Sequence, residues 1–266
     1  MGGALIDLVG FDGLLEPLVF DCRRGTADDE RGALAFLAGR IPGAFHLHLD
    51  DDLSAPLDEG VLGGRHPLPH PDDLQALMRR HGLTGGRPVV ACDDVGNPYA
   101  ARLWWMLRWL GHEATYVLDG GFAAWTAAGR PLESGVARTP AAGDWTARPQ
   151  PGWTVDAAAA GRLGAEGRLV DCRSPARFRG EVEPLDPIAG HIPGAVNRFW
   201  RDQLDGEQRL IRAPEVPEGA ALYCGSGVTA CVVALALAAH EGHIPPLYPG
   251  SWSDWLARGG DVETSV

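Results

Sequence analysis

One of the five cysteines in this chain of 266 residues, Cys224, has the surroundings of a nucleophile. It follows the apolar run Ala-Ala-Leu-Tyr and begins the sequence Cys-Gly-Ser-Gly-Val-Thr. A strand that ends in a glycine-bearing loop before a helix points several backbone N–H groups at one spot, with the positive end of the helix dipole behind them. A thiol placed there has a lowered pKa and reacts as the thiolate. We therefore predict that Cys224 is the working nucleophile.

The residues after Cys224 are suited to holding an anion. Glycines permit the unusual backbone angles that such a loop needs, and hydroxyl groups add hydrogen bonds to a sulfur anion. The predicted binding loop consists of Gly225, Ser226, Gly227, Val228 and Thr229.

The other four cysteines lie inside apolar strand or helix patterns, and we interpret them as packing residues: Cys22, Cys92, Cys172 and Cys231. An odd number of cysteines at irregular spacing, in a chain of this size, favours free thiols in a reducing compartment. We therefore expect a cytoplasmic protein.

The overall charge limits the classes of partner. A formal net charge of −12 argues against nucleic acid or an anionic membrane, because an acidic surface repels both. Apolar runs such as 230–239 are too short to cross a membrane, and the N-terminus lacks the basic region of a signal peptide. A small anionic substrate remains compatible with basic residues that are concentrated locally.

The sequence repeats itself in four places that follow in the same order. The matched pairs are 18–23 with 169–173, 39–44 with 190–195, 111–112 with 242–243, and 118–125 with 248–255. We interpret the chain as a tandem duplication. The predicted domains are residues 1–135 and 152–266, and the Pro- and Ala-rich stretch 136–151 is the predicted linker.

Each copy alternates short β-rich runs with longer helical patterns. The runs 88–92, 115–118 and 220–224 are predicted strands, and 99–110 and 229–240 are predicted helices. This alternation predicts an α/β fold in which each domain is a parallel sheet flanked by helices on both faces.

The two copies differ at the predicted nucleophile. When their central strands are aligned, Asp93 of the first copy stands where the second has Cys224. The loop of the first copy also contains Pro98, which has no amide hydrogen to donate.

Together these motifs resemble the tandem-domain rhodanese family, the thiosulfate and 3-mercaptopyruvate sulfurtransferases. The resemblance rests on Asp-x-Arg, Gly-His-Ile-Pro-Gly-Ala, the cysteine loop and the terminal Tyr-Pro-Gly-Ser-Trp, and it covers nearly the whole chain. It implies a catalytically silent N-terminal domain and a C-terminal domain in which Cys224 carries sulfur as a persulfide. A small anionic donor and a thiol, cyanide or thioredoxin-like acceptor are the implied partners. We expect no cofactor.

The resemblance also implies roles for other residues. Arg177 matches the arginine that grips the anionic end of the donor, and a planar guanidinium suits a carboxylate or sulfonate. Asp50 and His66 match residues of mercaptopyruvate sulfurtransferases that act with a catalytic serine, here Ser226. Each copy has the arginine of Asp-x-Arg, as Arg23 in the first and Arg173 in the second. We interpret each as a member of a structural ion pair.

Other interpretations of these residues remain open from the sequence. His46, His48 and Asp50 alternate as on one face of an extended segment and form an alternative metal site, although we expect no metal. Arg177 is alternatively a solvated surface residue. His66 is alternatively a simple loop residue.

The nature of the donor is left open. The family pattern Glu-Pro-Arg, whose arginine is a second carboxylate contact in mercaptopyruvate enzymes, is here followed only as far as Pro184, because position 185 is leucine. That loss weakens the case for an α-keto acid. The neutral Gly225-Ser226 loop, however, resembles the mercaptopyruvate type. Arg198 and Arg201 are candidates to replace the missing charge.

Two other classes of protein compete with this interpretation. A cysteine phosphatase needs Cys-x5-Arg to clamp phosphate, and position 230 is alanine. A non-catalytic rhodanese-like binding or sulfur-carrier module is the remaining alternative, although such modules usually lose the cysteine that this chain keeps.

Overall fold

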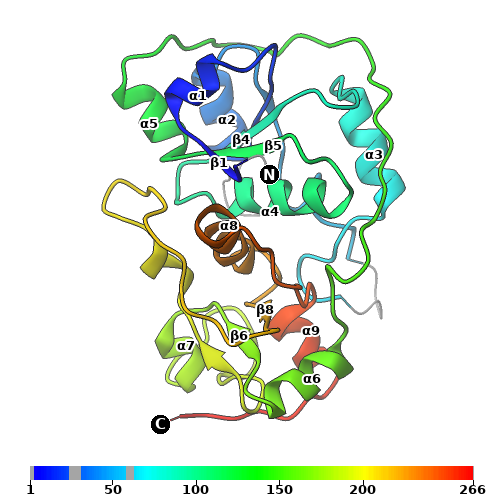
Figure 1. Cartoon of the computed structure of the whole chain (residues 1–266), viewed down its shortest axis with the longest axis vertical. Coiled ribbons are helices and arrows are strands. Elements are labelled where there is room, and N and C mark those ends of the chain that lie inside the picture. The colour runs from blue at the N-terminus through cyan, green and yellow to red at the C-terminus, as the bar shows by residue number, and fades with distance from the viewer. Residues whose placement is uncertain (1–2, 24–30, 58–62, 266) are drawn as a thin grey trace. The chain divides into compact units, whose positions relative to one another are not determined.

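The computed structural model describes residues 3–23, 31–57 and 63–265, and the chain forms two compact units (Figure 1). The first unit consists of Met1–Ala55, Pro69–Gln150 and Leu204–Leu210, and the second of Pro56–Leu68, Pro151–Gln203 and Ile211–Val266. The predicted domains are continuous ranges, whereas each unit here takes one short segment from the other half of the sequence. The assignment of silent and catalytic roles to the two domains stays a prediction.

The first unit is built on a five-stranded parallel sheet in the order β1-β5-β4-β2-β3. Its strands are β1 (Leu5–Ile6), β2 (Leu18–Asp21), β3 (Phe45–His46), β4 (Val89–Cys92) and β5 (Thr115–Leu118). Its helices are α1 (Leu8–Asp12), α2 (Arg31–Ala38), α3 (Pro71–Arg80), α4 (Pro98–Trp109) and α5 (Gly121–Ala127). In Figure 1, α1, α2 and α5 lie on one side of this sheet and α4 on the other.

The second unit has a three-stranded parallel sheet in the order β7-β6-β8. Its strands are β6 (Leu169–Asp171), β7 (Val196–Asn197) and β8 (Ala221–Tyr223). Its helices are α6 (Ala157–Ala165), α7 (Pro175–Arg179), the 3-10 helix η1 (Trp200–Gln203), α8 (Ala230–Glu241) and α9 (Ser251–Ala257). Parallel bridges from Leu222 to Leu247 and from Leu247 to Thr154 extend the sheet, so its order follows that of the first unit. The predicted α/β fold is confirmed.

Apolar side chains explain why the helices cover the sheets. In the first unit, Phe36 of α2 and Trp125 of α5 pack against strand residues of one face. In the second, Ala160 of α6 and Trp252 of α9 do the same. Helix α8 is apolar all round and is buried from its first residue to Leu237, as expected of a core helix.

The Asp-x-Arg motif forms a buried ion pair in each unit, as predicted. Asp21 and Arg23 are joined at 2.6 Å, and Asp171 and Arg173 at the same distance. Burying a charge is costly unless it is paired, so both members of each pair stabilise the fold only together. These arginines lie at the carboxyl ends of β2 and β6, where they fix the start of the next loop.

The predicted linker, residues 136–151, contains no helix and no strand, but most of it belongs to the first unit. The Gly143 amide donates to the Arg79 carbonyl, and the Trp145 amide donates to the Leu83 carbonyl. The Trp145 side chain is buried. This stretch is therefore held along the first unit by backbone hydrogen bonds.

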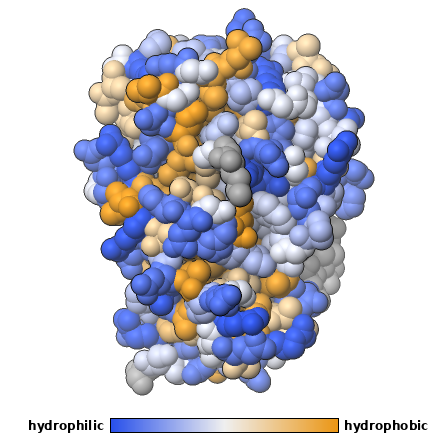
Figure 2. Space-filling view, in the orientation of Figure 1, coloured by the Kyte–Doolittle hydropathy of each residue, from blue (hydrophilic) through white to orange (hydrophobic). Residues whose placement is uncertain are grey.

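The surface carries many hydrophilic side chains on the face shown in Figure 2, with apolar residues interspersed among them. Among the described helices, none combines the length and the apolar character that crossing a membrane requires.

Candidate active site

Cys224 follows the last residue of β8 and precedes the loop that leads into α8. Its backbone is held on both sides, because its amide donates to Ser251 Oγ and its carbonyl accepts from the Trp252 amide. Gly227 has a φ of 76°, a left-handed conformation that a glycine adopts without strain. Cys224 therefore sits at the carboxyl end of a parallel strand, where ligands of open α/β sheets bind.

The electrostatic environment of Cys224 favours the thiolate. Burial raises the pKa of a thiol, but here hydrogen bonds from the Thr229 hydroxyl and from the amides of Ala230, Ser226 and Gly227 outweigh it, and the pKa is lowered. Cys172 shows the opposite result, since burial raises its pKa well above the ordinary value. The loop thus gives Cys224 the character of a nucleophile, and Cys172 that of a packing residue.

Cys22 and Cys92 are buried in the first unit, and burial raises the pKa of each thiol well above its ordinary value. The fifth cysteine, Cys231, is a buried residue of α8 whose Sγ lies 3.4 Å from the Gly227 carbonyl. The described cysteines form no disulfide.

Ser226 of the loop is hydrogen-bonded to His66, which lies far away in the sequence but within the same compact unit. The distance from Ser226 Oγ to His66 Nδ1 is 2.7 Å. Ser226 is buried, so this hydroxyl–imidazole pair lies in a partly water-excluded place. A serine in contact with an imidazole can relay a proton to or from a reacting molecule.

Helix α9 holds the segment that carries His66. The Gly63 amide donates to Asp254 Oδ1, and the Arg65 amide donates to Ser253 Oγ. Asp254 is buried and in turn accepts from the Tyr248 hydroxyl. The terminal Tyr-Pro-Gly-Ser-Trp motif thereby lies at the base of the segment 63–66 and fixes its path beside the cysteine loop.

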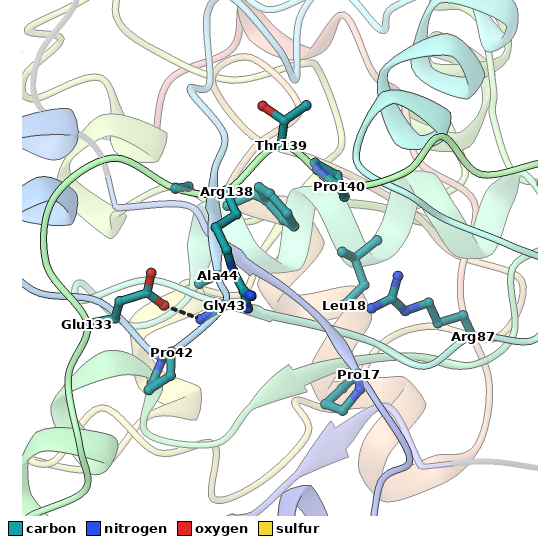
Figure 3. Close-up of a pocket in the computed structure, with 12 residues that line it drawn as sticks. Pro17, Leu18, Pro42, Gly43, Ala44, Arg87, Glu133, Arg138, Thr139 and Pro140 are labelled. Atoms are coloured by element: carbon teal, nitrogen blue, oxygen red, sulfur yellow. Dashed lines mark hydrogen bonds between the residues drawn. The ribbon is translucent and has the colours of Figure 1, made fainter.

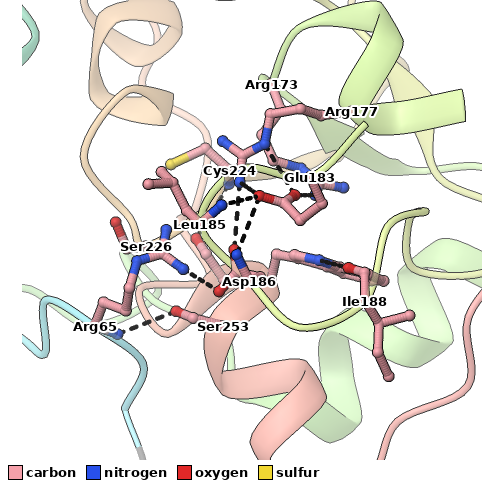
Figure 4. A network of polar contacts seen from close by, with 12 residues as sticks. Arg65, Arg173, Arg177, Glu183, Leu185, Asp186, Ile188, Cys224, Ser226 and Ser253 are labelled. Atoms are coloured by element: carbon pink, nitrogen blue, oxygen red, sulfur yellow. Dashed lines mark hydrogen bonds and ion pairs between the residues drawn. The ribbon is translucent and has the colours of Figure 1, made fainter. Parts of the chain in front are cut away.

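Arg177 lies in a network of charged side chains (Figure 4). Its guanidinium donates to both oxygens of Glu183, at 2.9 and 2.7 Å, and to Asp186 Oδ2 at 3.3 Å. Arg173 also donates to Glu183, at 3.2 Å. Burial raises the pKa of the Glu183 carboxyl, but hydrogen bonds from Arg177 and from nearby amides leave it lowered. Arg177 is thus not a freely solvated surface arginine.

Arg65 is a site residue that the sequence did not reveal. Its guanidinium is paired with Asp186, and a Cβ atom added to Gly225 would lie 2.9 Å from Arg65 Nη2. The same Cβ position lies 3.4 Å from Arg177 Nη2. Two cations therefore approach the cysteine loop next to Cys224. The available signal was its position directly before His66.

Arg198 and Arg201, the candidates to replace the arginine missing at position 185, contact other parts of the chain. Arg198 donates to the carbonyls of Glu215 and Asn197, and Arg201 lies over the ring of Trp200 at 4.8 Å. Both side chains therefore serve the chain around η1.

In the first unit, the loop that corresponds to the cysteine loop binds the side chain of one of its own residues, Asp93. Cys92 pairs with Asp21 and Tyr223 with Asp171, so Asp93 and Cys224 occupy the same position. The carboxylate of Asp93 accepts hydrogen bonds from four backbone amides, those of Val95, Asn97, Tyr99 and Ala100. An internal carboxylate thus fills this anion-binding loop.

Asp50 belongs to the first unit, where its Oδ2 lies 3.9 Å from His48 Nδ1. His46 instead approaches the Arg23 carbonyl with its Nε2, at 2.9 Å. The described residues contain no group of three or more His, Cys, Asp or Glu side chains able to hold a metal ion. A role for Asp50 beside His66 stays a prediction.

A cavity of about 330 Å³ lies in the first unit, whereas Cys224 and its loop belong to the second (Figure 3). Its lining includes Leu18, Gly43, Arg87, Glu133 and Arg138. Leu18 is the first residue of β2, so the cavity lies at the amino end of that strand. Because ligands of parallel sheets bind at the opposite ends, it is not the candidate site.

The chain is similar throughout to known proteins. A model of the rhodanese-like domain matches residues 8–128 and again residues 155–258. A probable 3-mercaptopyruvate sulfurtransferase of Pseudomonas aeruginosa is 44% identical over 91% of this chain and 91% of its own length. A putative thiosulfate sulfurtransferase of Mycobacterium tuberculosis is 40% identical over 87% of this chain and 85% of its own.

Solved structures agree with these matches. A 3-mercaptopyruvate sulfurtransferase from Leishmania major superposes with a TM-score of 0.82 at 28% identity, covering 96% of this chain and 75% of that one. The match of one domain model to both halves, together with relatives above 30% identity across most of the chain, decides the family. The chain belongs to the rhodanese family and carries the rhodanese-like domain twice.

Proposed function

We propose that this chain is a sulfurtransferase whose donor is 3-mercaptopyruvate and whose sulfur-carrying residue is Cys224. The observation that carries the choice of donor is the 2.7 Å hydrogen bond between Ser226 Oγ and His66 Nδ1, because Ser226 lies two residues after Cys224 in the same loop. When 3-mercaptopyruvate gives up its sulfur, the rest of the molecule leaves as an enolate. The enolate needs a proton, and this pair can deliver one.

The first displacement moves sulfur from the donor to the protein. The Cys224 thiolate attacks the thiol sulfur of 3-mercaptopyruvate, a sulfur–sulfur bond forms, and the carbon–sulfur bond breaks with its electron pair passing to an enolate. The proton of the donor thiol ends on the methyl carbon, so pyruvate leaves and Cys224 holds a persulfide anion. This is covalent catalysis in two steps.

The surrounding residues have separate parts in this step. The amides and the Thr229 hydroxyl that lower the pKa of Cys224 also stabilise the persulfide anion. Arg177 binds the donor carboxylate with its planar fork. Ser226 and His66 carry the proton. The family resemblance implies a part for Asp50 in the same step.

The second displacement returns the free thiolate. A thiophilic acceptor attacks the outer sulfur of the persulfide and leaves with it, as thiocyanate when cyanide is the acceptor or as a new persulfide when a thiol is. A small thiol or a thioredoxin-like protein is the acceptor class that fits this chemistry, because its thiolate is a good nucleophile.

Thiosulfate is the second candidate donor. It is favoured by the relative of Mycobacterium tuberculosis, whose name is putative thiosulfate sulfurtransferase, and by two guanidinium groups near the loop, which suit a dianion. Against it, sulfite leaves as a stable anion and needs no proton, so the Ser226–His66 pair would have no task.

The test is the formation of thiocyanate from cyanide with each donor, measured for the wild type and for Cys224→Ser. We expect faster turnover of 3-mercaptopyruvate and no turnover by the variant. Thiocyanate formed by Cys224→Ser would refute the nucleophile. A faster reaction with thiosulfate would reverse the donor, and no reaction with either donor would favour a binding module.

A further inference from the structure

Position 185 is leucine in this chain, where the family pattern Glu-Pro-Arg has an arginine. Leu185 is 63% exposed, and its backbone amide donates to Glu183 Oε1, as does the amide of Asp186. The loop is therefore folded around Glu183, and the side chain at 185 contributes no cation to it. A donor carboxylate bound only by Arg177 would lack its second contact.

A buried carboxylate, Asp186, brings another cation to the same place. Its side chain is only 4% exposed and is paired with Arg65 through one oxygen and with Arg177 through the other, at 3.3 Å. A buried charge needs such partners, since an unpaired one is costly. Asp186 thus positions the guanidinium of Arg65 beside that of Arg177, although the two arginines are 112 residues apart in the sequence.

The guanidinium groups of both arginines approach the cysteine loop at Gly225. Arg65 Nη2 lies 2.9 Å from the position that a Cβ atom on Gly225 would occupy, and Arg177 Nη1 lies 3.5 Å from it. Within the part of the chain that the structure describes, neither of these two nitrogens has a hydrogen-bond partner. A glycine at 225 leaves room where they converge.

We propose that Arg65 and Arg177 together form the carboxylate subsite for the sulfur donor, with Arg65 replacing the arginine that position 185 lacks. This inference rests on the proposed function and names the residue that completes donor recognition. In 3-mercaptopyruvate the carboxylate is separated from the sulfur-bearing carbon by a single carbonyl. The donor can therefore reach Cys224 with its sulfur while its carboxylate lies beside Gly225.

The carboxylates paired with the arginines fix the geometry of the subsite. Three cations, Arg65, Arg173 and Arg177, face three carboxylates, those of Asp171, Glu183 and Asp186. The carboxylates hold the guanidinium groups from one side, so their remaining N–H groups are presented to the donor in a fixed geometry. Planar, charge-assisted hydrogen bonds of this kind favour a carboxylate.

The experiment replaces the charge at 65 and returns it at 185. Arg65→Met removes the guanidinium but keeps the unbranched stem of the side chain. We expect the KM for 3-mercaptopyruvate to rise about 10- to 100-fold, the loss of one charge-assisted hydrogen-bonding group, with a smaller change in kcat. Adding Leu185→Arg to Arg65→Met should restore most of the affinity, because position 185 is exposed and adjacent to Asp186.

Two further variants make the result specific. Arg65→Lys keeps the charge and the pairing with Asp186 but loses the fork, so we expect an intermediate KM. Arg179→Met is the matched control, because Arg179 lies on the same helix as Arg177 and is paired with the exposed Glu181. An unchanged KM in Arg65→Met, or no recovery on adding Leu185→Arg, would overturn the assignment.

A second measurement separates this inference from the proposed function. Pyruvate, which has the carboxylate but no sulfur, should protect Cys224 from alkylation by iodoacetamide in the wild type and protect it less in Arg65→Met. If the wild type did not turn over 3-mercaptopyruvate, the proposed function would fall while this difference upheld the subsite. Equal protection in both proteins would overturn the subsite, whichever donor is used.

Discussion

At the scale of single residues, the contrast between Cys224 and Cys172 shows how little burial alone decides about a thiol. Both side chains are almost completely buried. Cys172 has no set of donors that outweighs the cost of an internal charge, whereas Cys224 has the Thr229 hydroxyl and loop amides. The hydrogen-bond donors therefore separate a cysteine with a lowered pKa from one with a raised pKa in the same compact unit.

This contrast predicts the pH dependence of alkylation. Because the pKa of Cys224 is lowered, its reaction with iodoacetamide should reach half of its maximal rate below pH 9, while Cys172 stays unmodified. Thr229→Val removes the largest stabilising hydrogen bond and should move the half-maximum to higher pH. Peptide mass spectrometry across a pH series measures both. A Thr229→Val profile that coincides with the wild type would contradict the role of this hydroxyl.

The Ser226–His66 pair gives a second prediction at this scale. Ser226→Ala keeps the loop amide but removes the proton relay, so kcat with 3-mercaptopyruvate should fall about 100-fold, a typical contribution of a positioned acid–base group. The rate with thiosulfate should change much less, because sulfite leaves without a proton. His66→Gln should behave like Ser226→Ala, and the exposed His243→Gln serves as the control. Equal losses with both donors would refute the relay.

At the scale of the elements, the same strand–loop–helix arrangement occurs in both units but surrounds a different side chain in each. After β8 the loop presents its amides to a thiol, and after β4 the corresponding loop presents them to the Asp93 carboxylate. Pro98 begins α4 and contributes no N–H, yet the four remaining amides suffice to bind both carboxylate oxygens. The backbone geometry is thus an anion site in both units, and the side chain at its centre decides whether chemistry is available.

The same carboxylate makes stability depend on pH. Burial raises the pKa of Asp93 to about 6, although backbone amides oppose that rise. A carboxyl whose pKa is higher in the folded state loses stabilisation as pH increases. Relative to Asp93→Asn, the wild type should therefore lose about 2 kcal/mol of unfolding free energy between pH 4 and pH 7. Urea unfolding at several pH values measures this.

A carboxyl with the opposite shift provides the control. A hydrogen bond from Arg130 lowers the pKa of Asp12, so its stabilisation is present at neutral pH and is lost as pH falls through the lowered pKa. The difference between the wild type and Asp12→Asn should therefore change in the reverse direction. If Asp93→Asn and Asp12→Asn gave the same sign, the burial of Asp93 would not be the cause.

At the scale of the whole molecule, charge is distributed unevenly between surface and site. The chain carries a net charge of −12, whereas the ion-paired network of Arg65, Arg173 and Arg177 contains as many carboxylates as arginines. Long-range repulsion should thus slow the approach of an anionic donor. Raising NaCl from about 10 to 100 mM should increase kcat/KM for the donor about two-fold, because salt screens charges beyond about 10 Å. A neutral thiol acceptor should show no such rise, and a decrease for the donor would contradict this.

Much of the fold followed from the sequence because its signals are local. Strands, crossover helices and the Asp-x-Arg pairs each depend on short patterns, and the predicted strand at 115–118 has the observed bounds. The segment 63–68 could not be assigned in this way, since its place depends on contacts with α9 such as that of Gly63 with Asp254.

The residues of the candidate site were likewise predictable only where their signal is local in the sequence. Cys224 and its loop were predictable because one continuous stretch forms the nest. Arg65 was not, because its partner Asp186 lies 121 residues away and no pattern links them. The sequence did show that a charge was absent at 185, and the structure supplies a cation from another segment. Arg198 and Arg201 were nearer in sequence to the second motif but serve the chain around η1.

The carboxylate of Asp93 also has an evolutionary consequence for the first domain. Introducing a cysteine there would replace a carboxylate that accepts four amide hydrogen bonds by a single sulfur atom, while Pro98 would still withhold a donor from the new thiolate. A single codon change thus sacrifices structure before it gains any reactivity. Asp93 and Cys224 are consequently not readily interchanged.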